Sequence, residues 1–202
     1  MFLDIEKGKF LVNLARAAIE EYLNHGVQIE PPANTPSELF DKRGVFVTLK
    51  KFPSGELRGC IGFPEPIIPL VIATIYAAIS AATNDPRFRP VRPHEMENLV
   101  VEVTVLTPPE RLNVPPNDLP KAIKVGRDGL IVRCGAAAGL LLPQVPVEWG
   151  WNEEEFLSQV CIKAGLPPNC WLNPACEFYK FQGQVFTEVK PYGEVIEEDL
   201  SP

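Results

Sequence analysis

The sequence predicts an α+β protein in which helices pack on a largely antiparallel sheet. Strand-like runs arrive mostly as neighbouring pairs joined by turn residues, and helical runs are interspersed at longer spacing. A regular alternation of strands and helices, which builds parallel sheets, is absent from the chain. Because strands joined by short turns pair in antiparallel fashion, these observations favour this fold class.

Four segments have the features of helices. Their apolar side chains recur at three- and four-residue steps or form one continuous apolar run. Gly26 can take positive φ and ends the first of them, and Asn152 is a suitable N-cap for the last. The expected helices are 7–23, 35–42, 67–82 and 153–164.

The strand predictions follow from alternating or β-branched runs bounded by turn residues. The clearest is 99–107, where Val101, Val103 and Val105 share one face. An Asp128-Gly129 step predicts a hairpin turn between two further strands. The last segment, 178–189, is expected to be one strand or a hairpin. The other predicted strands are 45–50, 57–62, 122–125, 130–133 and 140–142.

Composition narrows the classes of function. The chain has 202 residues and 46% apolar residues, which fits one globular domain over 1–202. A net charge of −7 counts against nonspecific binding of nucleic acid. The first nine residues have no apolar leader, and the run 67–82 is too short to span a bilayer, so we expect a cytoplasmic protein without membrane contact. The 22 prolines stiffen loops, which fits a thermophilic source.

The five cysteines are sparse, odd in number and without CxxC spacing, which is typical of a reducing compartment. We therefore expect buried free thiols, with a Cys170–Cys176 disulfide as the alternative in a thermophile. Zinc ligands normally come in closely spaced pairs, so neither a metal site nor a cofactor is expected. Signatures of P-loop, dinucleotide-binding and serine-hydrolase proteins are also absent from the sequence.

The segment 57–62, Leu-Arg-Gly-Cys-Ile-Gly, is the most unusual strand sequence in the chain. Gly59 and Gly62 leave room for close approach of a backbone or a ligand. Arg58 and Cys60 share a face of a flat strand, so the cation can lower the pKa of the thiol or bind an anion. The structural alternative is a glycine-bulged strand with an inert cysteine and an arginine paired to a carboxylate.

Two further segments contain candidate ligand-binding groups. Asp85 and Arg87 belong to a proline-bounded loop that also carries Arg89 and Arg92, and arginines bind carboxylates and phosphates in bidentate fashion. Gln144 follows a buried apolar run and lies between two prolines. Its amide can contact a ligand, or satisfy backbone groups of its own loop. The loop arginines can likewise pair with nearby acids instead of a ligand.

Several of these segments occur together, and in the same order, in a known family. They are 44–49, 57–62, 85–88, 100–107, 125–130, 140–145 and 163–166, with Trp171. The chain resembles the AMMECR domain family over nearly its whole length, and most closely its stand-alone archaeal members. The resemblance implies an α+β fold with a larger and a smaller subdomain that form one intertwined body. It places the family's recurrent residues at Arg58, Cys60, Asp85, Arg87 and Gln144, and supplies no established reaction.

Two hypotheses follow. In the first, the protein is an enzyme or redox participant with a cleft around 57–62, where Cys60 is catalytic and an anionic substrate is bound by Arg58, Asp85, Arg87 and Gln144. In the second, it is a binding or scaffold module, because the resemblance implies association with Memo-like or radical SAM proteins. A role with nucleic acid is a weaker third reading, and it requires the exposed arginine patch.

Overall fold

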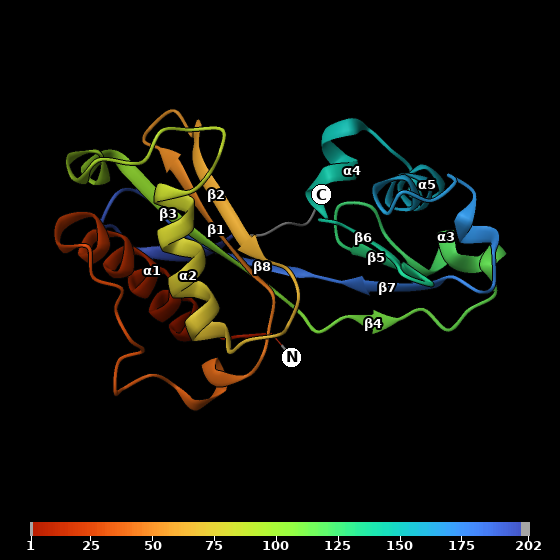
Figure 1. The fold of residues 1–202 in the computed structure, drawn as a ribbon, viewed down its shortest axis with the longest axis horizontal. Helices are drawn as coiled ribbons and strands as arrows, with labels where there is room; N and C mark the ends of the chain where they lie inside the picture. Colours follow the sequence, from red (N-terminus) through yellow and green to blue (C-terminus); the bar gives the residue numbers. More distant parts are fainter. Residues whose placement is uncertain (1, 199–202) are drawn as a thin grey trace. The chain divides into compact units, whose positions relative to one another are not determined.

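The computed structural model describes residues 2–198, which divide into two compact units. Unit 1 comprises residues 2–107 and 184–198, and unit 2 comprises residues 108–183. The chain therefore leaves unit 1 once and returns to it, as the colour order in Figure 1 shows. Each unit combines helices with an antiparallel sheet, so the expected α+β class with a larger and a smaller part is confirmed.

The helices are α1 (Ile5–His25), α2 (Leu70–Thr83), α3 (Leu119–Ala122), α4 (Gln144–Trp149) and α5 (Glu153–Lys163). Short 3₁₀ segments are η1 (Ser37–Phe40), η2 (Pro93–Asn98), η3 (Pro116–Asp118) and η4 (Cys170–Leu172). The strands are β1 (Val45–Lys51), β2 (Leu57–Phe63), β3 (Leu99–Leu106), β4 (Glu110–Arg111), β5 (Gly129–Cys134), β6 (Ala137–Leu141), β7 (Glu177–Phe181), β8 (Gly183–Glu188) and β9 (Val195–Glu198). No helix within residues 2–198 is long and apolar enough to cross a membrane.

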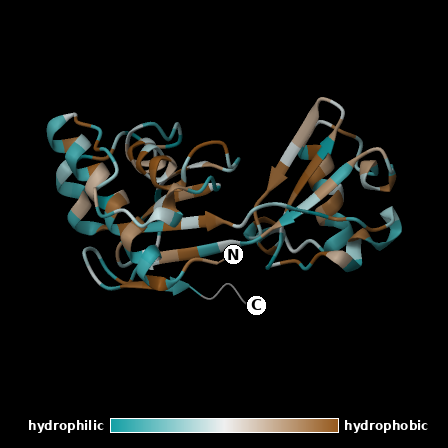
Figure 2. Cartoon of the chain, turned by 90° about the horizontal axis from the view of Figure 1, so that it is seen from below, coloured by the Kyte–Doolittle hydropathy of each residue, from teal (hydrophilic) through white to brown (hydrophobic). Residues whose placement is uncertain are grey.

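Unit 1 is a five-stranded sheet, in the order β2-β1-β3-β8-β9, covered by α1 and α2. Asp4 caps α1 by accepting the Lys7 amide at 2.9 Å, and Gly26 ends it at φ 68°. Figure 2 shows α1 hydrophilic on its outer side and hydrophobic toward the rest of the unit. The core holds a buried ion pair, Arg16 with Glu188 at 2.6 Å, which joins α1 to the end of β8.

Unit 2 is a four-stranded sheet, in the order β4-β7-β5-β6, with α5 packed on it. The predicted cap of α5 is confirmed: Asn152 Oδ1 accepts the Glu155 amide, and the Glu155 carboxylate accepts the Asn152 amide, both at 2.9 Å. Phe156 and Leu157 of α5 are fully buried against β5.

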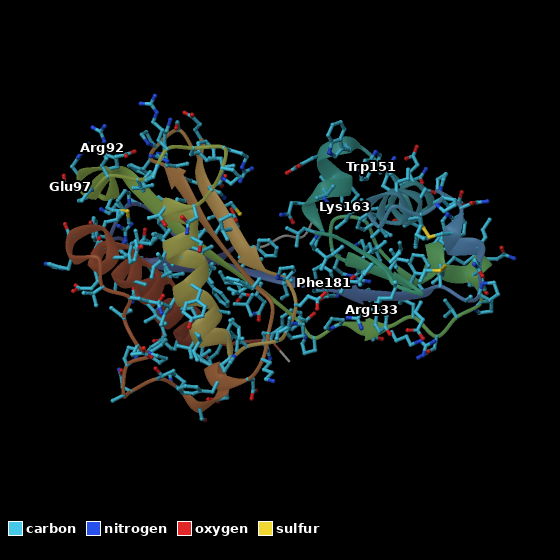
Figure 3. The ribbon with its side chains drawn as sticks, in the orientation of Figure 1. Arg92, Glu97, Arg133, Trp151, Lys163 and Phe181 are labelled. Atoms are coloured by element: carbon cyan, nitrogen blue, oxygen red, sulfur yellow. A yellow bond between two sulfur atoms is a disulfide. The ribbon has the colours of Figure 1, made fainter. Side chains whose placement is uncertain are left out.

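The expectation of free thiols is wrong for the cysteines of unit 2. Cys134 is bonded to Cys176, and Cys161 to Cys170, which are the yellow bonds in Figure 3. The alternative pairing, Cys170 with Cys176, is wrong as well. Disulfide formation depends on the approach of Cβ atoms in the folded chain, and sequence spacing does not reveal which of them meet. Cys60 alone among the five is a free thiol.

Three local predictions are also corrected. Residues 122–125 are not a strand, because α3 ends at Ala122 and the hairpin forms instead between β5 and β6. Its turn contains Gly135, at φ 60°, in place of the Asp-Gly step. Segment 178–189 is neither a single strand nor a hairpin, since β7 and β8 belong to different sheets. Helix 35–42 is reduced to the 3₁₀ segment η1.

Candidate functional site

Strand β2 carries Cys60 at one edge of the unit 1 sheet, where it pairs with β1 alone. Its two glycines are explained by close packing within the protein. A Cβ on Gly59 would collide with the carbonyl oxygen of Ala81 in α2, and a Cβ on Gly62 would collide with the ring of Phe46. The sequence left open whether a backbone or a ligand approaches the two glycines. The groups that do so are the backbone of α2 and the aromatic ring of Phe46.

Asp85 and Arg87 cover the free edge of β2 at Cys60. The Cys60 amide donates to Asp85 Oδ2 at 2.9 Å, so it points away from β1. Arg87 donates from Nε and Nη2 to the two Asp85 oxygens at 3.0 and 2.8 Å, and Nη2 lies 3.5 Å from the Cys60 carbonyl oxygen. Unpaired edge groups are a liability in a sheet, and this pair of side chains occupies them. Cys60, Asp85 and Arg87 are therefore in direct contact at this strand edge.

The Asp85 carboxylate is almost completely buried, with 2% of the side chain exposed. Hydrogen bonds from the Arg87 side chain, with those from the Cys60 and Arg87 amides, hold the pKa of Asp85 well below its usual range despite burial. Asp85 is therefore ionised at any ordinary pH. Arg87 differs from it in accessibility, because 54% of its side chain is exposed.

Arg58 lies at a β-bulge of strand β2. The register of β1 and β2 shifts between Leu49, opposite Gly59, and Lys50, opposite Leu57, so Arg58 is the unpaired residue. Its guanidinium donates to both carboxylate oxygens of Glu95, at 2.9 and 3.1 Å, and to the Arg89 carbonyl at 3.0 Å.

Arg58 is thereby occupied within the protein. Only 11% of its side chain is exposed. Burial by itself would raise the pKa of Glu95, but the hydrogen bonds from Arg58 and from the Arg92 amide lower it. Pairing of Arg58 with a carboxylate is the structural alternative that the sequence left open. The N–H groups that donate to Glu95 and Arg89 are those that an anionic substrate would need.

The Cys60 thiol is half-buried, and the Thr48 hydroxyl donates to its sulfur at 3.3 Å. Burial raises the pKa of the Cys60 thiol above its usual value. This effect outweighs the Thr48 hydrogen bond and the positive charge of Arg87, which both lower the pKa. The thiol is therefore protonated near neutral pH, and the nearby cation does not produce the thiolate that a nucleophile requires.

A row of polar residues beside Cys60 was not singled out from the sequence. Thr48 lies opposite Cys60 on one side and opposite Glu102 on the other, so the three share one face of the sheet. Lys50 Nζ contacts Glu102 Oε2 at 2.5 Å, and burial raises the pKa of Glu102 although Lys50 lowers it. In the alternating sequence 99–107, Glu102 lies on the face of the strand opposite to the valines. This alternation is the sequence feature from which the row of polar residues could have been predicted.

Gln144 lies in unit 2, as the first residue of α4, and it is exposed. The other four predicted residues belong to unit 1. Within residues 2–198, no three His, Cys, Asp or Glu side chains are grouped so that they could hold a metal ion.

Fold and site together define an α+β protein of two antiparallel sheets, with a thiol on an edge strand that an Asp–Arg pair covers. The AMMECR1 family model matches residues 12–186, so the chain belongs to this family. It is 61% identical to protein PH0010 of Pyrococcus horikoshii, over 96% of both chains. It is also 61% identical to protein MK0488 of Methanopyrus kandleri, over 98% of this chain and 97% of that protein. The crystal structure of PH0010 superimposes with a TM-score of 0.83.

Proposed function

We propose that unit 1 is a binding module that docks an anionic group of a partner protein on Arg87, beside the neutral Cys60 thiol. The observation that carries this proposal is the unequal accessibility of the two arginines. Arg58 is held by Glu95 with 11% of its side chain exposed, whereas 54% of the Arg87 side chain is exposed. Arg87 uses Nε and Nη2 for Asp85, so an anionic group that binds Nη1 would leave the covered strand edge intact.

The partner we propose is a Memo-like or radical SAM protein that presents a carboxylate. A charged contact at the rim of an interface mainly affects the rate of association and the dependence of that rate on salt. Arg87 is anchored by Asp85 in one orientation, and a fixed guanidinium loses less conformational freedom on binding than a mobile one. The arrangement therefore suits recognition of one geometry of carboxylate.

The test compares two charge-matched variants for binding to a purified Memo-like or radical SAM protein. Arg87→Gln should weaken binding about tenfold and flatten its salt dependence. Arg89→Gln removes an exposed cation two residues away, whose side chain makes no hydrogen bond within residues 2–198, and should leave binding almost unchanged. Cys60→Ala should also bind normally. Full binding by Arg87→Gln, or loss of binding by Cys60→Ala, would contradict the docking proposal.

A small anionic ligand would use the same guanidinium. Inorganic phosphate serves as the probe, and the Nε–H resonance of Arg87 reports its binding. We expect phosphate to bind weakly, because one exposed guanidinium in water gains little from one ion pair. Saturation by phosphate at micromolar concentration would replace the protein partner with a small molecule as the occupant of this site.

A second candidate function rests on the state of the thiol. A thiol that stays protonated is a poor nucleophile, but it is a source of a hydrogen atom. Toward a substrate radical generated by a radical SAM partner, Cys60 would give up the hydrogen atom of its S–H bond. The products are a closed-shell substrate with a new bond to hydrogen and a Cys60 thiyl radical, which an external one-electron reductant returns to thiol with one proton.

The rate of Cys60 alkylation by iodoacetamide, measured across pH, distinguishes the docking and hydrogen-atom-donor functions from catalysis by a thiolate. Because burial raises its pKa, the rate should rise with a midpoint above about 8.5, the value of a model thiol. A midpoint below that value would support Cys60 as a thiolate nucleophile and contradict the protonated thiol. The disulfides of unit 2 do not interfere, since Cys60 is the one free thiol of the chain.

We also propose the cytoplasm as the location of the protein. Two disulfides would ordinarily indicate an oxidising compartment, but intracellular proteins of thermophilic archaea are a known exception. The relatives from Pyrococcus and Methanopyrus support such a setting.

A further inference from the structure

Arg43, which precedes β1 in unit 1, is a buried cation without a counter-ion. Only 8% of the residue is exposed. Its Nη1 atom is completely buried and has no hydrogen-bond partner, and Nε and Nη2 make no hydrogen bond or ion pair within residues 2–198 either. Removal of a charge from water is costly unless the charge is paired and hydrogen-bonded. The charge of this guanidinium is therefore left uncompensated by the described part of the chain.

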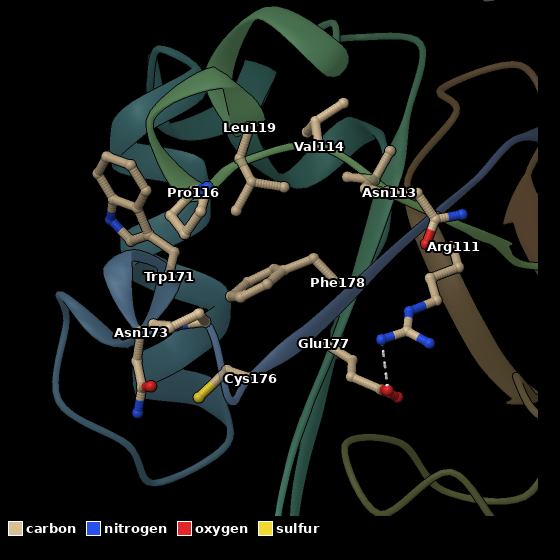
Figure 4. Close-up of a pocket in the computed structure, with 12 residues that line it drawn as sticks. Arg111, Asn113, Val114, Pro116, Leu119, Trp171, Asn173, Cys176, Glu177 and Phe178 are labelled. Carbon is tan, nitrogen blue, oxygen red and sulfur yellow. Dashed lines mark ion pairs between the residues drawn. The ribbon is translucent and has the colours of Figure 1, made fainter.

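Other arginines of the protein show the arrangement that Arg43 lacks. Arg16, of which 6% is exposed, donates from Nε and Nη2 to the two carboxylate oxygens of Glu188, both at 2.6 Å. At the pocket of unit 2 drawn in Figure 4, Arg111 is likewise paired, with Glu177 at 2.7 Å. The missing acid is thus a particular feature of the surroundings of Arg43, and it points to an anion that comes from outside the chain.

Backbone contacts place Arg43 beside the start of α2. The Leu70 amide donates to the Asp41 carbonyl oxygen at 2.9 Å, and Lys42 forms an antiparallel β-bridge with Pro69. The segment that precedes β1 therefore runs alongside the residues at which α2 begins. The Asp41 side chain is exposed and makes no ion pair with Arg43, although it is close in sequence.

The side chain of Arg43 lies on the helix-covered face of the sheet. The β1–β3 ladder extends through Gly44, whose carbonyl oxygen accepts the Leu106 amide at 2.9 Å. Side chains alternate between the two faces of an extended chain, so Arg43 shares the face of Val45, which is buried in the core under the helices. Figure 1 shows that α2 begins at the same end of the sheet as β1. The Arg43 guanidinium is thereby directed toward the N-terminal end of α2.

The first turn of α2 is a second positive feature without a matching acid. Its N-cap residue makes no side-chain hydrogen bond, and no acidic residue occurs in the first turn. The amides of Val71 and Ile72 have no hydrogen-bond partner within residues 2–198, and the helix dipole carries positive charge at this end. At the start of α1 the corresponding acids are already used, because Asp4 and Glu38 both pair with Lys7.

We propose that Arg43, at the first turn of α2, binds a phosphate group. A guanidinium offers phosphate a bidentate contact, and the N-terminus of a helix favours an anion. A phosphate dianion matches the two positive features together, whereas a carboxylate carries a single charge. The exposed 8% of Arg43 keeps the residue in reach of solvent, so the source of the phosphate group is either the free ion or an ester.

This site is independent of the docking group proposed on Arg87. Arg87 contacts Cys60, and Thr48 is the residue of β1 opposite Cys60. Arg43 precedes Thr48 by about 16 Å of extended chain. The phosphate site and the docking group therefore use separate cations, and a variant of one leaves the other intact.

The test is an NMR titration of the whole chain with inorganic phosphate at constant ionic strength. We expect saturable shifts of the Arg43 Nε–H resonance and of the amides of 70–73, with a Kd below about 1 mM, while the Arg87 Nε–H resonance moves little. Sodium acetate should bind about tenfold more weakly than phosphate. Methyl phosphate distinguishes the two sources. Affinity equal to that of inorganic phosphate identifies an ester, weaker binding identifies the free ion, and either result supports the site.

Arg43→Met removes the charge and keeps most of the side-chain volume. It should weaken phosphate binding about tenfold, whereas Lys42→Met, which removes the neighbouring exposed cation, should change binding by less than about twofold. Amide hydrogen exchange of β1 in urea provides a second readout. Without phosphate, Arg43→Met should be at least as stable as wild type, because a buried unpaired charge is removed. Saturating phosphate should stabilise wild type and leave Arg43→Met unchanged.

Four outcomes would overturn the proposal. The first two are the absence of a saturable shift at Arg43 up to about 10 mM phosphate, and equal phosphate binding by Arg43→Met. The third is binding of acetate as tightly as phosphate, which would assign the guanidinium to a carboxylate ligand. The fourth is a loss of stability in Arg43→Met that is the same with and without phosphate, because Arg43 would then serve packing alone.

Discussion

Replacement of Asp85 by asparagine should destabilise unit 1 and free the edge of β2. The carboxylate accepts four hydrogen bonds, from the Cys60 amide and from the amide, Nε and Nη2 of Arg87, at 2.8 to 3.0 Å. Asparagine keeps one acceptor oxygen and turns an NH2 group toward the remaining donors. At least two of the four hydrogen bonds are therefore lost.

The size of the effect follows from which donors remain buried. A hydrogen bond to a charged group contributes about 1.5–3 kcal/mol, and a buried donor left without a partner costs a similar amount. The Arg87 side chain is half exposed and can turn to water, so its contribution is discounted. One unsatisfied backbone amide and one lost charged bond remain, which together predict a loss of about 3 kcal/mol in the free energy of unfolding.

The loss of stability in Asp85→Asn must be measured by a signal that comes from unit 1. All three tryptophans, at 149, 151 and 171, lie in unit 2, so their fluorescence does not follow it. Amide hydrogen exchange of segment 57–63, which is strand β2, follows the unfolding of unit 1. Glu56→Gln, which loses an exposed pair with Lys51 in the same unit, is the control and should cost less than about 0.5 kcal/mol.

The pH dependence gives a second signature of Asp85. Its folded pKa lies below the unfolded value of about 3.9, so its stabilisation is complete above that pH and declines as pH falls toward the folded pKa. The difference between wild type and Asp85→Asn should be constant from about pH 5 to 8 and shrink below about pH 4. A loss under about 1 kcal/mol at neutral pH, or a difference that persists unchanged in acid, would refute the reasoning.

Two further predictions concern Glu102 and the disulfides. Because burial raises the folded pKa of Glu102, its contribution to stability is greatest below the unfolded pKa of about 4.3 and is lost as pH rises through the folded value. Glu102→Gln should therefore gain stability relative to wild type as pH rises, and a pH-independent difference in urea unfolding would contradict this. Removing the Cys134–Cys176 bond, with a separation of 42 residues, should cost about 4 kcal/mol, and removing Cys161–Cys170, with a separation of 9, about 3 kcal/mol. Tryptophan fluorescence of the paired serine variants measures both, and the reverse order would count against the loop-entropy account.

Elements whose own residues determine them were predictable from the sequence. The strand at 99–107 follows from alternation of valines at 101, 103 and 105, which are almost fully buried in β3. The cap at Asn152 depends only on a residue three positions away. In both cases the deciding contacts are local, so the pattern along the chain contains the required information.

Contacts between distant segments were not predictable in the same way. The Asp128-Gly129 step has the composition of a hairpin turn, yet Asp128 is fully buried and accepts the Lys124 amide at 2.9 Å. The partner of Arg58 lies 37 residues further along the chain, at Glu95. Residue type predicted that Arg58 would pair with a carboxylate or bind an anion, but only the fold decides which.

The same distinction shows which parts of the 57–62 segment the architecture requires. Gly59 is needed because a backbone atom of α2 occupies the space of its Cβ. Arg58 is bound to Glu95, and Asp85 covers the strand edge through the backbone of residue 60, whatever side chain that residue carries. The fold therefore uses the Cys60 amide and does not depend on its sulfur. Cys60→Ala should change the stability of unit 1 by less than about 1 kcal/mol, so any larger effect on partner binding or radical transfer would report on function and not on folding.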